Sequence, residues 1–214
     1  MFSPNCDFYR NDYEKYRMKW KSQYEVDLED YVNKELSKDS ILFSLRIPDS
    51  AQVYQGRYGE VFLGKDSRID DFLVLSLGDE KSVIGAYVHI APFCLISGKN
   101  GFIIGDFSGL SAGVKIYTAS ADYSGKYLSH PPAPLAFRNP QQGPVVIGRH
   151  CIFGANTVIL PGVTIPNGVA VGANSLVDRC LDPWTIYAGN PVRALRDRSK
   201  GCLEKEAQFI ETLL

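Results

Sequence analysis

A large aliphatic or aromatic residue returns at every sixth position between residues 145 and 177. An α-helix has an apolar period of about 3.6 residues and a β-strand one of about two, so neither explains this spacing. Six residues suit a short strand followed by a corner, and three such units close one triangular coil. The large residues, which would fill the coil interior, are Ile147, Phe153, Ile159, Ile165, Val171 and Val177.

The positions between the large residues support the same interpretation. The residue four positions after each large one also points inward, and it must be smaller because it sits at a corner. These smaller residues are Cys151, Thr157, Val163, Val169 and Ser175. Gly162 and Gly168 fall at corners, where a backbone with positive φ costs glycine little. Stacked coils would bury a continuous core and pair each backbone with the coils above and below.

The six-residue pattern extends upstream with short interruptions and predicts five coils. Their inward residues are, coil by coil, Leu63, Ile69 and Leu75; Ile84, Ile90 and Ile96; Ile104, Leu110 and Ile116; Ile147, Phe153 and Ile159; Ile165, Val171 and Val177. The long interruption, residues 117–146, predicts a loop that leaves the solenoid and carries function. An ordinary β-sandwich does not account for fifteen residues kept in one register. We therefore expect a mainly β protein, a parallel β-helix of about five coils over residues 61–195.

The two ends of the chain lack the six-residue period. Residues 1–60 are rich in tyrosine, and residues 26–38 look helical, with Asp27 placed to cap a helix. Residues 202–214 also have helical periodicity, so residues 196–214 are assigned to a C-terminal helix. We expect both extensions to cover the open ends of the stack, where backbone groups would otherwise be unpaired.

Composition narrows the class of protein. The formal net charge is -1 over 214 residues, which gives no electrostatic reason to expect nucleic acid or an anionic membrane as a partner. No apolar run reaches the roughly 18 residues of a membrane span, and the N-terminus lacks the apolar segment of a signal peptide. We therefore expect a cytoplasmic protein. The five cysteines are scattered without a CxxC pair, which favours buried reduced thiols over disulfides or zinc.

The repeat and its neighbouring motifs together resemble a known family. The segment GPVVIGRHCIFGANTVILPGVTIPNGVAVGANSLV and the later PWTIYAGNPVRAL resemble the C-terminal half of the galactoside and maltose O-acetyltransferases. The segments HIAPFCLISG and IIGDFSGLSAGVKIYTASADYSGKYLSHPPAP resemble sugar acetyltransferases of O-antigen and capsule pathways. The likeness covers roughly residues 60–200. It implies a left-handed β-helix, a homotrimer with sites between subunits, and acetyl transfer from acetyl-CoA to a sugar hydroxyl or amine in surface polysaccharide biosynthesis.

The resemblance also implies a place for acetyl-CoA, the co-substrate. Ala155 and Ala173 are small corner residues that leave room for a pantetheine arm, whose amides their backbone groups could pair. Four arginines follow the last coil and could bind the nucleotide phosphates. They are Arg179, Arg193, Arg196 and Arg198. The alternative for each of them is an ordinary solvated surface residue.

Transfer to a hydroxyl or amine needs a general base, and the three histidines are the candidates. The related enzymes carry a catalytic histidine in a T-A-T-H pattern, whereas Ala121 stands at that place in this sequence. His89 precedes the inward Ile90, so its side chain points outward. The resemblance implies that this coil faces the acceptor in a site shared with a neighbouring subunit, which makes His89 the first candidate. His130, in the proline-rich segment YLSHPPAP, is the second, and His150 is expected to be a plain surface residue. Transfer assisted by the substrate alone, without a protein base, stays open.

The loop at 117–146 supplies further candidates for the site. Asp122 could orient a histidine of the adjacent subunit and stabilise its cationic form. Tyr123 and Ser124 could hydrogen-bond the acceptor. The competing interpretation is a loop whose Asp and Ser residues only stabilise the loop itself.

Three other functions are alternatives to the acetyltransferase. A γ-type carbonic anhydrase has the same fold, but its zinc needs three histidines, and those of this chain are 41 and 20 residues apart, so we expect no metal. A nucleotidyl transferase with a β-helical tail needs an N-terminal nucleotide-binding domain, which residues 1–60 are too short to form. A non-catalytic oligomerisation or interaction scaffold is the third alternative, and it predicts no affinity for CoA.

Overall fold

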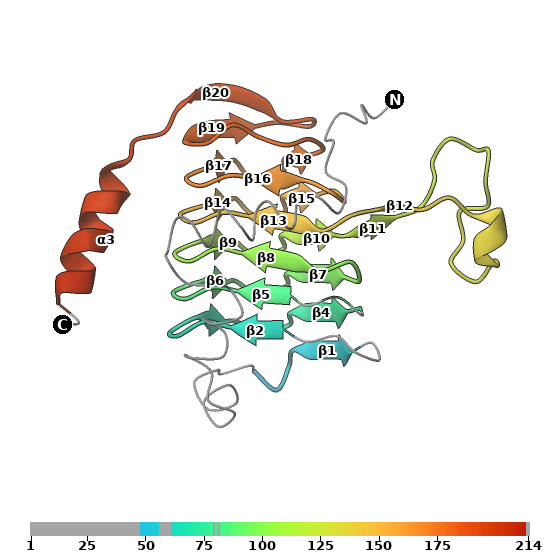
Figure 1. Ribbon diagram of the computed structural model, residues 1–214, viewed down its shortest axis with the longest axis horizontal. Coiled ribbons are helices and arrows are strands. Elements are labelled where there is room, and N and C mark those ends of the chain that lie inside the picture. Colours follow the sequence, from blue (N-terminus) through green and yellow to red (C-terminus); the bar gives the residue numbers. More distant parts are fainter. Residues whose placement is uncertain (1–47, 56–60, 79, 81, 213–214) are drawn as a thin grey trace.

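The computed structural model describes residues 48–55, 61–78, 80 and 82–212. The chain winds into a stack of triangular coils, with an extension leaving on one side and a helix on another (Figure 1). The five predicted coils are present, and β1 (Gln52–Gln55) and β19 (Thr185–Ala188) add partial turns at the ends, so that the stack has about six turns. The predictions for residues 1–47, including the helix capped by Asp27, lie outside the described residues.

Each coil contributes one strand to each of three sheets, and neighbouring coils pair in parallel. Sheet 1 contains β2 (Val61–Leu63), β5 (Ser82–Ile84), β8 (Phe102–Ile104), β13 (Val145–Ile147) and β16 (Thr164–Ile165). Sheet 2 contains β3 (Arg68–Ile69), β6 (His89–Ile90), β9 (Gly109–Leu110), β14 (Ile152–Phe153), β17 (Ala170–Val171), β19 and the antiparallel β20 (Arg193–Asp197). Sheet 3 contains β1, β4 (Val74–Leu77), β7 (Leu95–Gly98), β10 (Lys115–Tyr117), β15 (Val158–Ile159) and β18 (Leu176–Val177).

The pairing register confirms the predicted coils. The inward residues of sheet 1 lie opposite one another, and they are Leu63, Ile84, Ile104, Ile147 and Ile165. The inward residues of sheets 2 and 3 follow the same rule. All fifteen side chains are buried, as are the five smaller corner residues. Burying one large aliphatic side chain contributes roughly 1.5–3 kcal/mol, so this column of side chains is the main source of stability.

The corner between sheets 1 and 2 places one residue of each coil in the left-handed backbone region. These residues are Asp66, Tyr87, Phe107, His150, Gly168 and Trp184, with φ from 53° to 76°. The Tyr87 and Phe107 rings stack with centroids 5.0 Å apart, and Phe107 stacks on His150 at 5.3 Å. Stacking between coils offsets the conformational cost of this region, about 1–2 kcal/mol for each residue with a side chain. Gly162 and Gly168 have positive φ, as predicted.

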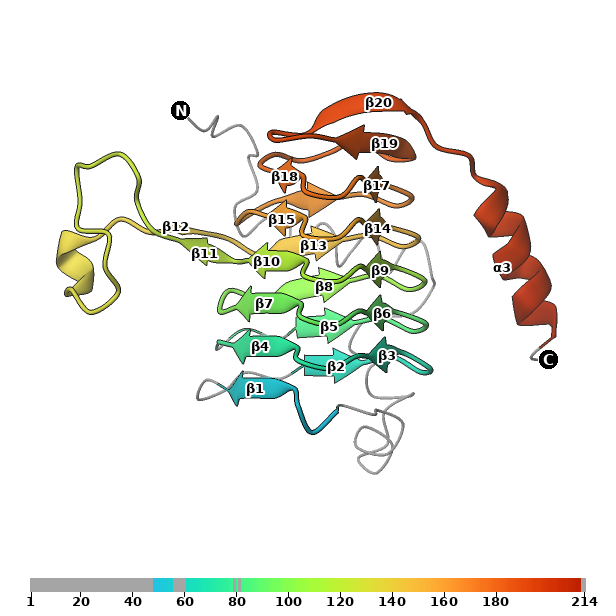
Figure 2. The ribbon, with the colours of Figure 1, turned by 180° about the vertical axis from the view of Figure 1, so that it is seen from behind.

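An extension occupies the interval where the sequence predicts a loop. After β10, β11 (Ala119–Ser120) leaves the stack, the chain turns through the 3-10 helix η1 (Leu135–Phe137), and β12 (Gln141–Gln142) returns antiparallel to β11. The extension connects sheet 3 to sheet 1, and it projects away from the stack in both views (Figures 1 and 2). The coils resume in register on its far side, where Ile159 pairs with Ile116.

The C-terminal helix α3 (Gly201–Glu211) lies beside the stack, along the corner between sheets 1 and 2 (Figures 1 and 2). Its Phe209 ring makes edge contacts with the Tyr87 and Phe107 rings, at 5.2 and 6.4 Å between centroids. The expectation that this helix covers the open end is wrong, because β20 pairs with β19 and closes the end of sheet 2 itself. Within the described residues, no helix is long and apolar enough to cross a membrane.

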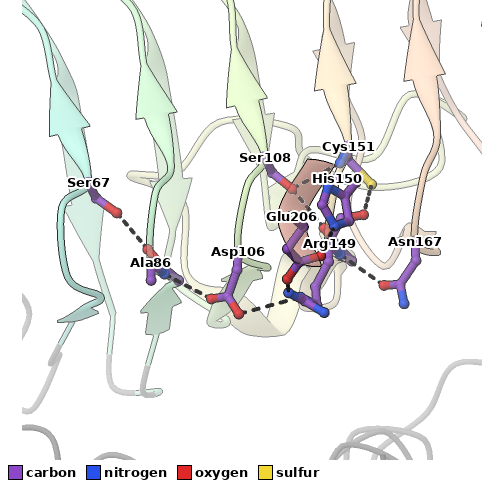
Figure 3. Close-up of polar contacts among 11 residues, drawn as sticks. Ser67, Ala86, Asp106, Ser108, Arg149, His150, Cys151, Asn167 and Glu206 are labelled. Atoms are coloured by element: carbon purple, nitrogen blue, oxygen red, sulfur yellow. Dashed lines mark hydrogen bonds and ion pairs between the residues drawn. The ribbon is translucent and has the colours of Figure 1, made fainter. Parts of the chain in front are cut away.

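Polar contacts fix α3 to the corner (Figure 3). Asp106 Oδ1 accepts a hydrogen bond from the Ala86 N–H at 2.8 Å, and Asp106 Oδ2 lies 3.5 Å from Arg149 Nε. Arg149 also forms an ion pair with Glu206 of α3, whose Oε2 lies 2.6 Å from His150 Nε2. One carboxylate of the helix therefore contacts two successive residues of the fourth coil.

The cysteines differ in state. Cys94 and Cys151 are buried free thiols at repeat positions, as predicted, and Cys202 is a free thiol that is half-buried. Cys180 is disulfide-bonded, so the prediction of five reduced thiols is wrong at this residue. Cys180 follows the last coil, outside the repeat positions that bury the other two.

Candidate active site

His89 lies on β6 with half of its side chain exposed on the outer surface of sheet 2, as the register predicts. Its Nε2 lies 2.8 Å from Asp70 Oδ2, and Asp70 Oδ1 accepts a hydrogen bond from Arg68 Nε at 2.6 Å. The hydrogen bond from His89 lowers the pKa of the Asp70 carboxyl below its usual 3.8, against a smaller opposing effect of burial. Asp70 is therefore ionised at neutral pH and orients the ring. A neutral imidazole that donates Nε2–H to Asp70 keeps a lone pair on Nδ1, as a general base requires.

Asp122 lies at the base of the extension, two residues after β11. Its Oδ2 accepts a hydrogen bond from the Ser124 hydroxyl at 2.7 Å, and its backbone carbonyl accepts one from the Ser129 hydroxyl at 2.8 Å. These contacts are those of a loop that stabilises itself. Tyr123 is 77% exposed, and His130 is exposed too. The roles of these residues toward an acceptor stay predictions.

A pocket of about 240 Å³ lies at the root of the extension. Ala121 and Asp122 line it together with Lys99, which belongs to the second coil, and Arg138, which follows η1. Ala121 is the residue that stands where the resemblance places a histidine, and none of the described residues that line the pocket is a histidine.

The structure does not bring His89 and Asp122 together within one chain. A coil is a triangle, and the extension leaves at the vertex between sheets 3 and 1. That vertex is opposite sheet 2, the side that carries His89. Both views show β6 and β11 on different sides of the molecule (Figures 1 and 2). A site that contains both residues therefore needs a second copy of the chain.

Ala155 and Ala173 lie at the corner between sheets 2 and 3, in successive coils. Asn174 N–H donates to the Ala155 carbonyl at 2.8 Å, so this carbonyl is already used by the coil stack. A Cβ added to Gly154 would overlap the Ala173 backbone, which shows how closely the coils approach here. The role of this corner in binding a pantetheine arm stays a prediction.

The four arginines after the last coil are dispersed. Arg193 and Arg196 are exposed on β20, and Arg179 is exposed and pairs with Asp178 at 2.8 Å. Arg198 is half-buried, and its Nη1 donates to three main-chain carbonyls at the corner between sheets 1 and 2, at 2.6 to 3.2 Å. This geometry gives Arg198 a structural contact in addition to its predicted role. Phosphate binding by these arginines stays a prediction.

His150 is not the plain surface residue that the sequence predicts. It is 6% exposed, its ring stacks on Phe107, and the Trp184 ring lies 6.3 Å away between centroids. Its ring nitrogen bonds Glu206. The prediction failed because Glu206 is 56 positions away in the sequence and reaches His150 only through the docking of α3.

Sequence reasoning missed Asp70, although a signal for it existed. Aligning the coils on their inward residues places Arg68 opposite His89, and Asp70 follows Ile69 directly at the end of the same strand. Lys99 and Arg138 were also missed, because neither position belongs to the repeat. Among the described residues, no group of three or more His, Cys, Asp or Glu side chains could hold a metal ion.

Comparison with known proteins identifies the family. Residues 144–179 match the family model described as the hexapeptide repeat of succinyl-transferase. A dTDP-4-amino-4,6-dideoxy-D-glucose acyltransferase of Escherichia coli is 36% identical over 182 residues, which cover 85% of this chain and 94% of the relative. The chain is a hexapeptide-repeat acyltransferase. A match of that length has to span the extension as well as the repeat, so the likeness of this acyltransferase to its relative is not confined to the solenoid.

Solved structures extend the comparison. The N-acyltransferase AntD of Bacillus cereus, as a variant in complex with dTDP-4-amino-4,6-dideoxyglucose and coenzyme A, is 36% identical with a TM-score of 0.75, over 85% of this chain and 97% of that one. AntD in complex with dTDP and 3-hydroxybutyryl-CoA is 38% identical with a TM-score of 0.72, over 77% and 86%. This acyltransferase shares their left-handed parallel β-helix.

A more local likeness is to WbbJ of Escherichia coli K12, a putative lipopolysaccharide biosynthesis O-acetyl transferase. It is 39% identical to this acyltransferase over 69 residues, which cover 32% of this chain and 35% of WbbJ. A match of this length is no longer than a few coils, so it supports the repeat and the acyltransferase family without reaching across the chain.

Proposed function

We propose that this chain transfers an acyl group from an acyl-CoA to the amine of a nucleotide-linked amino sugar during surface polysaccharide biosynthesis. The observation that carries the proposal is the length of the match to a dTDP-amino-sugar acyltransferase, 94% of that relative. The AntD complexes hold CoA together with dTDP or with the amino sugar nucleotide. The O-acetyltransferase relative matches only 32% of this chain, which favours an amine over a hydroxyl as the acceptor. The cytoplasm, where CoA and nucleotide sugars are available, is the location we assign.

The active site in this proposal lies between copies of the chain, in a homotrimer. The separation of the extension from sheet 2 supports it, because the extension leaves at the vertex opposite that sheet. The extension of one copy would meet the outer surface of the next, where His89 and the corner of Ala155 and Ala173 lie. Acyl-CoA would follow that corner, and the exposed Arg193 and Arg196 would be available to its phosphates.

His89 is the base in this mechanism. Asp70 holds the ring through Nε2, and Nδ1 takes a proton from the acceptor nitrogen as it attacks the thioester carbonyl. The new N–C bond forms, the C–S bond breaks, and the proton passes to the departing sulfur, so CoA leaves as the thiol. Asp70 stabilises the imidazolium that exists between the two proton transfers.

Acceptor-dependent thiol release from acetyl-CoA and from 3-hydroxybutyryl-CoA tests the function, with the acylated product identified by mass. We expect transfer to dTDP-4-amino-4,6-dideoxyglucose and none to dTDP-glucose, which offers hydroxyls only. His89→Asn should lower kcat at least a hundredfold, and His130→Asn, the matched control, should not. Loss of kcat in the His130 variant alone would show that the base is His130, in the extension.

A thermal-shift measurement with CoA on the same protein distinguishes an enzyme from a non-catalytic scaffold. A transferase should gain thermal stability from saturating CoA by mass action, as a ligand that binds only the folded state does. No thermal shift with CoA, together with no release of thiol from any acyl-CoA and acceptor pair, would reject the enzyme in favour of a scaffold.

A further inference from the structure

The pocket at the root of the extension contains two cations and one carboxylate. Lys99 and Arg138 line it together with Asp122. Neither cation forms an ion pair with any residue in the described part of the chain. The carboxylate is already hydrogen-bonded by Ser124. The pocket therefore has an excess of positive charge that its own residues leave uncompensated.

Arg138 indicates which kind of anion this positive charge would bind. Its Nε is buried and has no hydrogen-bond partner among the described residues, although the side chain as a whole is only half-buried. A buried N–H donor without an acceptor costs free energy, which a ligand oxygen can recover. A guanidinium presents donors in a planar fork and suits phosphate oxygens better than any single-point acceptor.

The size and the apolar side of the pocket limit what fits. A volume of about 240 Å³ lies below the roughly 300–1,000 Å³ of pockets that enclose whole ligands. The pocket thus holds one part of a larger molecule that continues into solvent or toward another copy. Leu128 and Leu135 line it too, and both are more than half exposed, so they form an apolar rim.

We propose that this pocket binds the diphosphate of the acceptor, with Arg138 and Lys99 as the phosphate-binding residues. The inference rests on the proposed function, since it supplies the nucleotide-binding part of the same acceptor site. The combination of two free cations with one carboxylate matches a molecule that carries both a diphosphate and an amine. CoA also carries phosphates, but it has no basic aliphatic amine to place near Asp122.

Calorimetric titration of dTDP into the whole protein tests the pocket. We expect Arg138→Met and Lys99→Met each to weaken dTDP binding at least tenfold while CoA binding stays within twofold of the parent. Lys126→Met is the matched control, because Lys126 is an exposed cation of the same extension that does not line the pocket, and its variant should bind dTDP normally. In the parent, affinity should fall from dTDP to dTMP to thymidine, and the effect of Arg138→Met should vanish for thymidine.

The outcomes separate this inference from the proposed function. Parent protein that does not bind dTDP, or Arg138 and Lys99 variants that bind it normally, overturns the pocket even if acyl transfer is observed. Variants that lose CoA binding as strongly as dTDP binding also overturn this assignment, and they would place the acyl donor in the pocket instead. Selective loss of dTDP binding in a protein that acylates no amino sugar supports the assignment of the pocket and rejects the proposed acceptor chemistry.

A nucleoside-free diphosphate, inorganic pyrophosphate, should compete with dTDP in the parent but not in Arg138→Met. Lack of competition in the parent would also overturn the diphosphate assignment.

Discussion

The Trp184 indole occupies the space that a side chain at Gly168 would need. Gly168 has φ +76, and a Cβ placed on it would overlap the six-membered ring of Trp184. The absent side chain lets the indole of the last corner lie against His150 of the coil below Gly168. Gly168 is thus required both for its backbone conformation and for the space above it.

Gly168→Ala should lower the free energy of unfolding by about 2–4 kcal/mol, from the left-handed backbone and the overlap with the indole together. Gly162→Ala is the matched control, since Gly162 has φ +75 and a Cβ added there would meet nothing within 4 Å, and it should lose only about 1–2 kcal/mol. Urea unfolding at equal protein concentration measures both. Equal losses would mean that Trp184 does not pack over Gly168.

Glu206→Ala should release α3 from the corner. The change leaves Arg149 and His150 without the carboxylate that both contact, and charged hydrogen bonds of this kind are worth about 1.5–3 kcal/mol each. Hydrogen exchange of the α3 amides should accelerate at least tenfold. Glu204→Ala, an exposed acid of the same helix, should leave the exchange unchanged. Unchanged protection in the Glu206 variant would show that Phe209 alone holds the helix.

Asp70→Asn should reduce stability at pH 7 but not in strong acid. The pKa of Asp70 is lowered in the folded state, so its contribution is present above the unfolded value and is lost as the pH falls through the folded value, below 3.8. The His89 ring is half-exposed, so solvent screens the pair, and we expect a difference of only about 0.2–1 kcal/mol. Denaturation midpoints of parent and variant should converge below that pH. Asp66→Asn, an exposed acid of the same coil, should show a smaller difference at pH 7.

The buried thiols should resist alkylation in the folded protein. Burial raises the pKa of Cys94 to about 11 and that of Cys151 to about 12, from 9.0, so almost no thiolate exists at pH 8. Iodoacetamide followed by mass spectrometry should find Cys202 modified and these two unmodified. Because the unfolded chain releases these protons near pH 9 and the folded chain keeps them, stability should fall as the pH rises above 9. Rapid labelling of Cys94 or Cys151 would indicate that the coils open.

The coils could be predicted because every repeat imposes the same local condition. A residue such as Ile147 must be large and apolar wherever the chain wraps the core, so the spacing alone gives its partner, Ile165 in the next coil. Aligning the coils even places His89 beside the end of the strand below it, where Asp70 lies. Asp122 was given the orienting role instead, because a loop insertion commonly carries function.

Contacts between the repeat and the rest of the chain could not be predicted in the same way. His150 occupies an ordinary corner position by its spacing, and Glu206 of the docked α3 covers it together with the Phe107 and Trp184 rings. Arg138 gives no sign in the sequence that its Nε is buried, because the fold of the extension decides that burial. Periodicity describes what repeats, and these contacts occur once.

The extension interrupts the stack without altering its pairing. Ile116 pairs with Ile96, 20 positions earlier, and with Ile159, 43 positions later, in the same register. The entropy of closing a loop grows with the logarithm of its length, and each doubling costs only about 0.6 kcal/mol. One buried aliphatic side chain outweighs that cost. Selection can therefore lengthen, shorten or exchange the segment that we assign to the acceptor while every coil keeps its neighbours, which makes this vertex the natural point for the specificity of such enzymes to diverge.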